Sequence, residues 1–494
     1  MGAPQRLGGR LPRFEAGQGR RYCQCRRSPL GLGATTPRAA RSDVLVLSNG
    51  HGEDAIACSV VQELMTSPAI RSIKVLPIVG EGKSFRKLGL QNVCERSAVM
   101  PSGGFIYRRP LALVRDLKSG LVGLTVDQIR ALKAWVDDVV EREEAEAIPV
   151  LVAVGDVVPL LFSAIACRRF RKKRKGMEAE VEVEVEESER KEPLVVFVGC
   201  AKSQYYLKAS RQEKKCVYYR WERWLLSRSC CRLVAPRDKL TAEVLERHLG
   251  EKVKYLGNPM MDNIEPSGLI ETWRNEEETK KKTRKWVTLL PGTRPGEMMR
   301  NAVQILSVCA LVGRRCSDTA FAFVLSIPDS SQMEAFDSLV LESGWRRRPS
   351  SNLVQREEGE ELYLYDRGEG RRSDSILILS DSVYPDAISS CDAAIAMAGT
   401  ATEQCVGLGN PVVTLIGEGP QFNRSFAEAQ VDLLGSDSIR LARTVPEAAE
   451  FLEIVLLKDE DASRRAKANG ARRMGYPGAS RRIADAALEL IAAV

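Results

Sequence analysis

A single unit repeats through most of the chain: a short apolar run rich in β-branched residues, a glycine-containing loop, and a stretch with helical spacing. Strands that alternate with helices in this way predict an α/β fold, in which crossover helices cover both faces of parallel sheets. The first set of runs is VLVLSNGHGED, IKVLPIVG, VLVAVGDVV, LVVFVGCA, RLVAPRD and VKYLGNP. The second set is WVTLLPGTRPGE, FAFVLSIP, ILILSDS, AAIAMAGTATEQ and PVVTLIGEG. We therefore expect two Rossmann-like, parallel-sheet domains.

Composition gives the expected boundaries of these domains. The first should span residues 43–265 and the second residues 286–494, with a polar linker over residues 266–285. Residues 168–192, a basic block followed by an acidic block, are typical of a solvated insertion, although their alternating Val and Glu also fit an exposed strand. Residues 344–373, rich in Arg, Glu and Gly, predict a surface loop. Because ligands of such sheets bind at the carboxyl ends of the strands, we expect the site in a cleft that the two domains face.

The net charge of +8 comes from one end of the chain. Residues 1–42 contain nine Arg and one acid, Glu15, and the remaining residues carry 64 basic and 64 acidic side chains. A neutral body offers no global basic field, so we expect no nucleic-acid partner. An Arg-rich, acid-poor start without a long apolar core predicts an organelle transit peptide over residues 1–42, and a disordered basic tail is the alternative.

Thirteen Cys and only two His limit metal and disulfide chemistry. No two Cys have CxxC spacing, and His51 and His248 are far apart in the sequence, so we expect no metal site and reduced thiols. Residues 148–167 are apolar enough to suggest a membrane span, but Asp156 and Pro159 lie in their middle, where a charge costs about 2.5–3.5 kcal/mol on insertion. The segment predicts a buried strand, a loop and a helix instead.

Two loops of the second domain contain residues that suit a diphosphate. Residues 291–297, PGTRPGE, and residues 398–404, AGTATEQ, each follow a predicted strand and begin a helix. The N–H groups at a helix start, a hydroxyl and a guanidinium favour a phosphate anion. Either loop could instead be only a capped helix start, and Thr400 with Glu403 matches a capping box. The substrate-binding candidates in these loops are Gly292, Thr293, Arg294, Gly399, Thr400 and Ala401.

Polar residues also follow two strands of the first domain. Residues 48–54, SNGHGED, place His51 and Asp54 where a helix begins. A His between two Gly is hard to explain by core packing, so we interpret His51 as a candidate general base for an acceptor hydroxyl. Asp156 ends an apolar strand, where a carboxylate is costly unless it is paired or functional. It is the other candidate base, and capping of the following helix is its alternative role.

In order and spacing, the motifs resemble a known enzyme family. LSNGHGED, VAVGD, YLGNPMMD, LLPGTRPGE and AMAGTATEQCVGLGNPVV resemble the lipid-A-disaccharide synthase family of glycosyltransferases, and especially its cyanobacterial and plastid branch of lipid-A-disaccharide synthase-related proteins. The resemblance covers most of residues 43–490 apart from the two insertions. It implies a GT-B fold and an inverting transfer from a UDP-sugar, with no cofactor and no required metal. It also implies that the nucleotide binds in the second domain and a lipid-linked sugar in the first, and it favours the plastid over the mitochondrion.

The motifs depart from the family pattern at several positions. Gln404 stands where the family has a Glu that grips the ribose, and Glu403 comes one place earlier, so both are candidate substrate-binding residues. Asn258, a further candidate, replaces a His of the GHPLxD pattern. Asp54 matches the Asp of the family's AGExSGD loop and is therefore a catalytic candidate, whereas Gly50 stands at the Glu of that loop. These differences leave the identity of the acceptor open.

Two segments could meet a lipid acceptor. Residues 105–109 combine apolar and basic side chains, and residues 218–224 interleave four aromatic residues with Arg220 and Arg223. Aromatic side chains anchor proteins at a membrane interface, and basic groups meet anionic lipid there. The helical spacing of Tyr218 and Trp221 is also typical of a buried core position. A peripheral membrane contact is therefore one of two interpretations of the second segment.

We expect a plastid protein that transfers a sugar from a UDP-sugar to a lipid or another hydrophobic acceptor by direct displacement. His51 or Asp156 would remove the acceptor proton, and Thr293, Arg294 and the helix start at Thr400 would hold the leaving diphosphate. A UDP-N-acetylglucosamine 2-epimerase-like enzyme is one alternative, and it would need no lipid surface. A GT-B protein that binds without turnover is another, which the residues at positions 50 and 404 favour.

Overall fold

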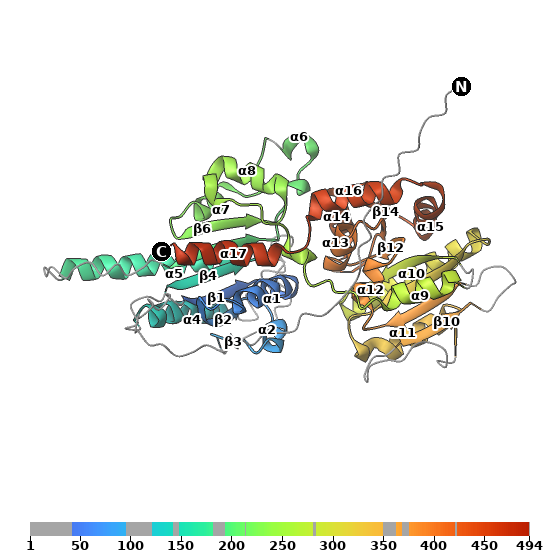
Figure 1. Cartoon of the computed structure of the whole chain (residues 1–494), viewed down its shortest axis with the longest axis horizontal. Helices are drawn as coiled ribbons and strands as arrows, with labels where there is room; N and C mark the ends of the chain where they lie inside the picture. Colours follow the sequence, from blue (N-terminus) through green and yellow to red (C-terminus); the bar gives the residue numbers. More distant parts are fainter. Residues whose placement is uncertain are drawn as a thin grey trace, which may run out of the picture. The chain divides into compact units, whose positions relative to one another are not determined.

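The computed structural model describes residues 42–94, 121–141, 148–180, 193–212, 214–279, 283–348, 362–367, 375–419 and 422–493 (Figure 1). It describes no side chain for His51, Leu121, residues 169–180, Glu278 and Pro295. Residues 40–494 form one compact unit. The expected transit peptide, apart from Ser42, and the segment 105–109 lie outside the described residues.

The first sheet, sheet A, is parallel throughout. Its strands are β1 (Ser42–Ser48), β2 (Ile70–Pro77), β3 (Gln91–Asn92), β4 (Pro149–Val154), β5 (Leu194–Gly199) and β6 (Cys231–Pro236), in the order β3-β2-β1-β4-β5-β6. β1, β4 and β5 are buried along their whole length. Continuous apolar runs of this kind are expected where helices cover both faces of a parallel sheet. Because all strands run the same way, the residues that follow β1, β4, β5 and β6 lie at one edge.

The helices of this half follow the strands as the sequence predicts. They are α1 (His51–Met65), α2 (Lys83–Lys87), α4 (Leu121–Glu141), α5 (Val157–Glu180), α6 (Ala209–Gln212), α7 (Arg220–Leu226) and α8 (Lys239–Leu249), with short 3₁₀ turns η2 (Gln204–Tyr206), η3 (Gly250–Lys252) and η4 (Pro259–Met261). One face of sheet A packs against α4, α5, α7 and α8, and the other packs against α1.

The second sheet, sheet B, is mixed. Its order is β14-β13-β12-β7-β8-β11-β10-β9, and β10 is antiparallel to both of its neighbours. The strands are β7 (Arg284–Leu290), β8 (Ala320–Ser326), β9 (Arg346–Arg347), β10 (Leu362–Asp366), β11 (Ile376–Ser380), β12 (Ala393–Ala396), β13 (Val412–Leu415) and β14 (Ile439–Ala442). The six strands other than β9 and β10 are parallel. The expected α/β class with two parallel-sheet units is confirmed.

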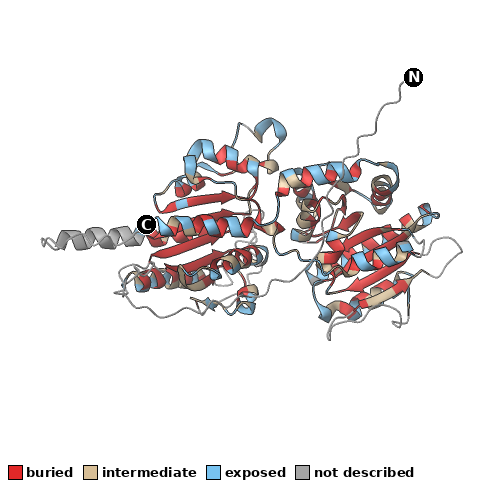
Figure 2. Cartoon of the chain, viewed as in Figure 1, coloured by how far each residue is buried: buried red, intermediate tan, exposed pale blue. Residues whose placement is uncertain are grey.

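Helices also cover both faces of sheet B. They are α9 (Leu269–Thr279), α10 (Pro295–Arg315), α11 (Met333–Glu342), α12 (Tyr384–Ser389), α13 (Thr400–Gly407), α14 (Arg424–Leu434), α15 (Val445–Glu453) and α16 (Ala462–Met474), with the turns η5 (Ser330–Gln332) and η6 (Ile454–Lys458). One more helix, α17 (Ala479–Ala492), follows α16. Figure 2 shows the central strands of both sheets as buried and the outer helix faces as exposed.

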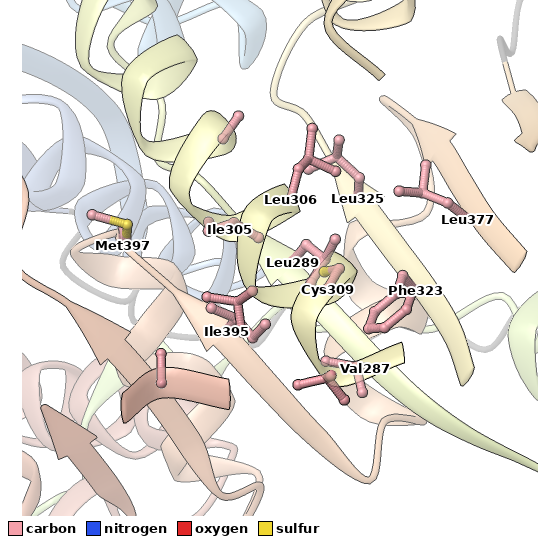
Figure 3. Packing of buried hydrophobic residues seen from close by; sticks show 14 of the residues in the cluster. Val287, Leu289, Ile305, Leu306, Cys309, Phe323, Leu325, Leu377, Ile395 and Met397 are labelled. Atoms are coloured by element: carbon pink, nitrogen blue, oxygen red, sulfur yellow. The ribbon is translucent and has the colours of Figure 1, made fainter. Parts of the chain in front are cut away.

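The largest apolar core lies between α10 and sheet B. Figure 3 shows Leu289 of β7 and Ile395 of β12 packed beside Ile305 and Cys309 of α10. Apolar residues recur along α10 at helical spacing, so one side of the helix is buried. This packing fixes the start of α10 against the carboxyl ends of β7 and β12, which is where the sequence predicts a diphosphate.

Three elements differ from the expected boundaries. Helix α5 continues to Glu180, so the first part of the expected insertion is helical, and residues 181–192 lie outside the described part. Helix α9 falls in the expected linker, yet Ile270 and Trp273 belong to a core with strands of sheet B. β9 and β10 fall in the expected surface loop and extend sheet B at its edge.

The last helix, α17, returns to the first sheet. Its apolar residues Ile483, Ala487 and Ile491 join the core between sheet A and α1. The side chain of Asp262 accepts hydrogen bonds from the N–H groups of Gly478 (2.5 Å), Ala479 (3.2 Å) and Ser480 (2.6 Å), and so caps α17. Residues 479–492 therefore complete the first half of the fold, although the sequence boundary assigned them to the second.

Candidate functional site

Two carboxylates meet at the carboxyl edge of sheet A. The N–H of Asn49, just after β1, donates to Oε2 of Glu53 at 3.1 Å, and the Asn49 side chain hydrogen-bonds Asp156 after β4. Gly155 has φ 122°, and a Cβ there would lie 2.3 Å from Oε2 of Glu53. Only glycine allows the Glu53 carboxylate to lie against this turn. Glu53, which the sequence analysis did not single out, is thus a neighbour of the predicted Asp156.

Burial changes the protonation of both acids. The pKa of Glu53 is raised to about 8, first by burial and then by the negative charge of Asp156. Burial also raises the pKa of Asp156, while the N–H of Val158 and the charge of Lys202 act to lower it. Oδ1 of Asp156 accepts that N–H at 2.8 Å, so Asp156 also caps α5. Near neutral pH Glu53 therefore holds its proton and lies as a neutral acid beside Asp156.

A lysine lies next to the acid pair. Nζ of Lys202 donates to both carboxylate oxygens of Glu222, at 2.6 and 2.7 Å, and lies 4.7 Å from the ring centroid of Tyr219. Glu222 is fully buried in α7. Beside it, the hydroxyl of the buried Tyr218 approaches Gly199 at the end of β5 and has no hydrogen-bond partner in the part of the chain that the structure describes. These contacts attach the aromatic segment of α7 to the edge that carries Asp156.

The two other predicted catalytic residues occupy different positions. Asp54 is 1% exposed, and its Oδ1 accepts a hydrogen bond from the hydroxyl of Ser48 at 2.5 Å. It is therefore turned into the first turn of α1. His51 is the first residue of α1, and its side chain lies outside the description. The helix begins after Gly50, at φ 141°, without a side-chain cap.

The first predicted diphosphate loop lies at the start of α10. Gly292 has φ 102°, and a Cβ there would lie 3.2 Å from the carbonyl oxygen of Met397, so the loops after β7 and β12 touch. The buried Asn301 side chain donates to the carbonyl oxygens of Pro291 (2.9 Å) and Met397 (3.3 Å) and holds both loops. Thr293 is exposed, and Arg294 is the exposed N-cap residue with no side-chain cap hydrogen bond.

The second predicted loop begins α13. Gly399, which has no side chain, is the N-cap residue, so the capping box of Thr400 and Glu403 does not form. Gln430 of α14 donates to the carbonyl oxygens of Ala398 (2.9 Å) and Gly399 (3.3 Å) and fixes the loop from behind. Thr400 is exposed, and Ala401 is half-buried. The first N–H groups of α13 are therefore available to a ligand rather than used by a cap.

The next two residues of α13 bind other parts of the chain. Oε2 of Glu403 accepts a hydrogen bond from Nη2 of Arg237 at 2.5 Å, across 166 residues of sequence. Oε1 of Gln404 accepts the hydroxyl of Tyr384 at 2.5 Å, and its Nε2 donates to the carbonyl oxygen of Met260 at 2.8 Å. The Gln404 amide is thus occupied by α12 and η4.

Asn258 lies at the crossing between the two halves. Its side-chain oxygen accepts the N–H of Met260 at 3.2 Å and caps η4. The residue is fully buried, and no described residue hydrogen-bonds its Nδ2. A buried amide without a partner carries a desolvation cost that a ligand contact would remove.

The two helix starts from different halves approach each other. A Cβ at Gly52, in the first turn of α1, would lie 3.5 Å from Oγ1 of Thr400 at the start of α13. Both starts have a glycine, Gly50 or Gly399, as the N-cap residue, so neither N-cap residue offers a side chain to the first N–H groups. The structure therefore brings together the loop of His51, the acid pair of Glu53 and Asp156, and the start of α13. Asp54 is buried beside Glu53, and its charge also raises the pKa of Glu53.

An exposed aromatic surface follows β5. Tyr219, Trp221 and Trp224 are 63%, 46% and 57% exposed, whereas the other four Trp of the chain are buried. The guanidinium of Arg228 lies 4.7 Å from the ring centroid of Trp224. We call Tyr219, Arg220, Trp221, Trp224 and Arg228 the α7 surface. Tyr218 is buried, so the two sequence interpretations of this segment apply to different residues.

No group of three or more His, Cys, Asp or Glu side chains that could hold a metal occurs among the residues described. In the same part of the chain, no helix has the length and apolarity that crossing a bilayer requires.

Sequence comparisons leave the family open: no family model matches, and no curated protein matches. Among solved structures, MurG of Acinetobacter baumannii is similar with a TM-score of 0.50 at 11% identity, over 91% of this chain and 99% of that one. S. aureus MnaA, solved with UDP, has a TM-score of 0.49 at 10% identity, over 92% and 98%. UDP-GlcNAc 2-epimerase from Neisseria meningitidis, bound to UDP-GlcNAc, has 0.46 at 12% identity, over 90% and 100%. With its two Rossmann-like sheets, the chain has the expected GT-B fold.

Proposed function

We propose that this protein is a glycosyltransferase that moves a sugar from a UDP-sugar to a lipid or another hydrophobic acceptor. The observation that carries this proposal is the approach of Gly52 in α1 to Thr400 in α13, beside the Glu53 and Asp156 acid pair. An uncapped helix start suits a leaving diphosphate, and a carboxylate suits removal of an acceptor proton. A transferase needs both within reach of one substrate carbon.

On the donor side, the diphosphate would bind at the starts of α10 and α13. The N–H groups after Gly292 and Gly399 donate to phosphate oxygens, and the exposed side chains of Thr293, Arg294 and Thr400 add a guanidinium and two hydroxyls. Positive groups aimed at the departing phosphate stabilise charge as it develops in the transition state. Direct displacement at the sugar carbon would invert its configuration.

On the acceptor side, Asp156 would take the proton from the attacking hydroxyl. Its raised pKa makes it a better base than an ordinary carboxylate, and neutral Glu53 beside it limits like-charge repulsion. His51, at the same helix start, is the other candidate base. The sugar–phosphate bond breaks as the hydroxyl oxygen bonds to the sugar carbon, and the proton goes to the base.

The lipid character of the acceptor is supported by the α7 surface. Exposed Trp and Tyr next to arginine are favoured where a protein meets an anionic membrane interface. Lys202 and Glu222 join this surface to the edge that carries Asp156. For the compartment we propose the plastid, reached through removal of residues 1–42, on the composition of that segment.

An epimerase-like activity on a UDP-sugar is the second candidate. The observation that favours it is the same acid pair, because a neutral acid next to a carboxylate can add and remove a proton on one substrate. Such an enzyme would change the UDP-sugar without any lipid acceptor.

Calorimetry with UDP and the full chain tests the donor side. The Arg294→Ala variant should weaken UDP binding about tenfold to a hundredfold, because a charge-assisted hydrogen bond contributes about 1.5–3 kcal/mol. Arg346→Ala, at a strand edge away from both loops, is the control and should bind as wild type does. Unchanged affinity for Arg294→Ala would mean that the loop is only a helix start.

A further inference from the structure

Arg237 is a buried cation at the carboxyl edge of sheet A. It follows β6, its N–H donates to the carbonyl oxygen of Gly199 at 3.1 Å, and the residue is 3% exposed. Its Nη1 donates to the carbonyl oxygen of Cys200 at 3.1 Å, and its Nη2 donates to Glu403 at 2.5 Å. Glu403 lies in the first turn of α13. The guanidinium is thus directed at the helix start that the proposed function assigns to the diphosphate.

The contacts of the Arg237 guanidinium leave some of its hydrogen-bond donors with a weak acceptor or with none among the described residues. Its third contact is the thioether sulfur of Met474 at 3.6 Å, which is a weak acceptor, and its Nε has no hydrogen-bond partner among the described residues. A buried guanidinium presents five N–H donors, and a buried charge is costly unless its donors are satisfied. Arg237 can therefore accept a stronger anionic partner than it has here.

The neighbourhood of this cation favours an anion. The start of α13 has no side-chain cap, and Thr400 approaches Gly52 at the uncapped start of α1. Each uncapped start presents N–H groups and the positive end of a helix dipole. Within the described residues around Arg237, Glu403 is the carboxylate that occupies the guanidinium, so it competes with any anion that arrives.

We infer that Arg237 binds the diphosphate of the nucleotide, and that Glu403 occupies the Arg237 guanidinium until the nucleotide binds. The arriving diphosphate takes the guanidinium, and Glu403 is released. This inference rests on the proposed function, because it takes the diphosphate of a UDP-sugar as the anion. It adds a binding residue from the first half of the fold to a donor site otherwise built from the second half.

The test measures UDP binding to the full chain by calorimetry. Glu403→Gln removes the internal competitor and should tighten UDP binding by about threefold to tenfold, because the freed guanidinium then meets the diphosphate directly. Arg237→Met should weaken binding about tenfold to a hundredfold, and Arg237→Lys, which keeps the charge without the planar fork, should fall between. Glu453→Gln breaks a similar ion pair with Arg315 (3.0 Å) far from both loops and should change nothing.

The inference predicts that the two substitutions change UDP affinity in opposite directions: Glu403→Gln raises it and Arg237→Met lowers it. If Glu403→Gln weakens UDP binding as much as Arg237→Met does, Glu403 is itself a ligand and the inference is overturned. Unchanged binding in Arg237→Met overturns it as well. If Arg237→Met does not fold, as judged by thermal melting, the Glu403→Gln and Arg237→Lys variants still decide.

A second probe separates this inference from the proposed function. Inorganic pyrophosphate has the diphosphate without the sugar or the base. If its binding follows the same order of variants while no UDP-sugar is consumed with any acceptor, the anion site stands and the transferase proposal fails. If wild-type protein binds neither UDP nor pyrophosphate, the inference fails.

Discussion

Among single residues, Glu53 gives the clearest pH dependence. Its pKa rises from the ordinary 4.5 to about 8, so the folded chain keeps a proton that the unfolded chain releases. This contribution to stability is complete below about pH 4.5 and is lost as the pH rises through about 8. The Glu53→Gln variant has no group that titrates at this position, so its stability does not fall in this way as the pH rises. We expect the variant's free energy of unfolding to exceed that of wild type by up to a few kcal/mol at about pH 8.5 and to differ little at about pH 5.

Urea unfolding at both pH values measures this effect. Glu246→Gln, on the exposed face of α8, is the matched control and should behave as wild type at both. An equal effect of Glu53→Gln at the two pH values would mean that Glu53 is ionised throughout and does not titrate with the acid pair.

Single residues were also where sequence analysis was least complete. It identified Asp156 from one feature, a carboxylate at the end of an apolar strand, and the structure puts that carboxylate beside Glu53. The sequence does contain a signal for Glu53, because residues 50–54 place two acids in one helix turn. Gly155, next to Asp156, is a position where another group can approach the backbone closely. The pair of Arg237 and Glu403 gave no signal, because its partners are 166 residues apart and no periodicity relates them.

Among elements, strands were predicted better than boundaries. The apolar runs of β1, β4, β5 and β7 have no alternation because both faces are covered, and that feature is local in the sequence. Helix α9 was assigned to a linker because its composition is polar, but Ile270 and Trp273 are enough to bury one side. Helix α17 returns to sheet A through the side chain of Asp262, a long-range contact that composition cannot reveal.

The α7 surface leads to a prediction about membranes. Replacing both Trp221 and Trp224 with Ser should reduce binding of the full chain to vesicles that contain anionic lipid at least about tenfold, because interfacial Trp side chains lose their apolar contact area. Flotation with and without anionic lipid measures it. Tyr476→Ser removes an aromatic that is 70% exposed on another element and should leave binding unchanged. Equal binding by the double variant and wild type would mean that the α7 surface does not bind the membrane.

For the whole molecule, the repeat of strand, loop and helix predicted two Rossmann-like sheets, and the structure has them in a GT-B fold. That much follows from the sequence because crossover connections of parallel strands allow few topologies. The meeting of the α1 and α13 starts could not be predicted, because it depends on long-range contacts of η4 with α1, α13 and α17. The proposed reaction needs that meeting, since acceptor and donor come from different halves.

Transfer of labelled sugar from a UDP-sugar into a lipid extract tests the central claim most directly. Wild-type protein should move the label into the organic phase and release UDP, and Asp156→Asn should lower the rate by about 10²–10⁴-fold if Asp156 is the base. UDP affinity of that variant should stay as in wild type, because the Asp156 carboxylate hydrogen-bonds Val158 and Asn49 rather than a residue of either diphosphate loop. If the label stays on an unchanged or epimerised UDP-sugar while the lipid remains unlabelled, for every UDP-sugar and lipid extract offered, the protein is not the transferase described above.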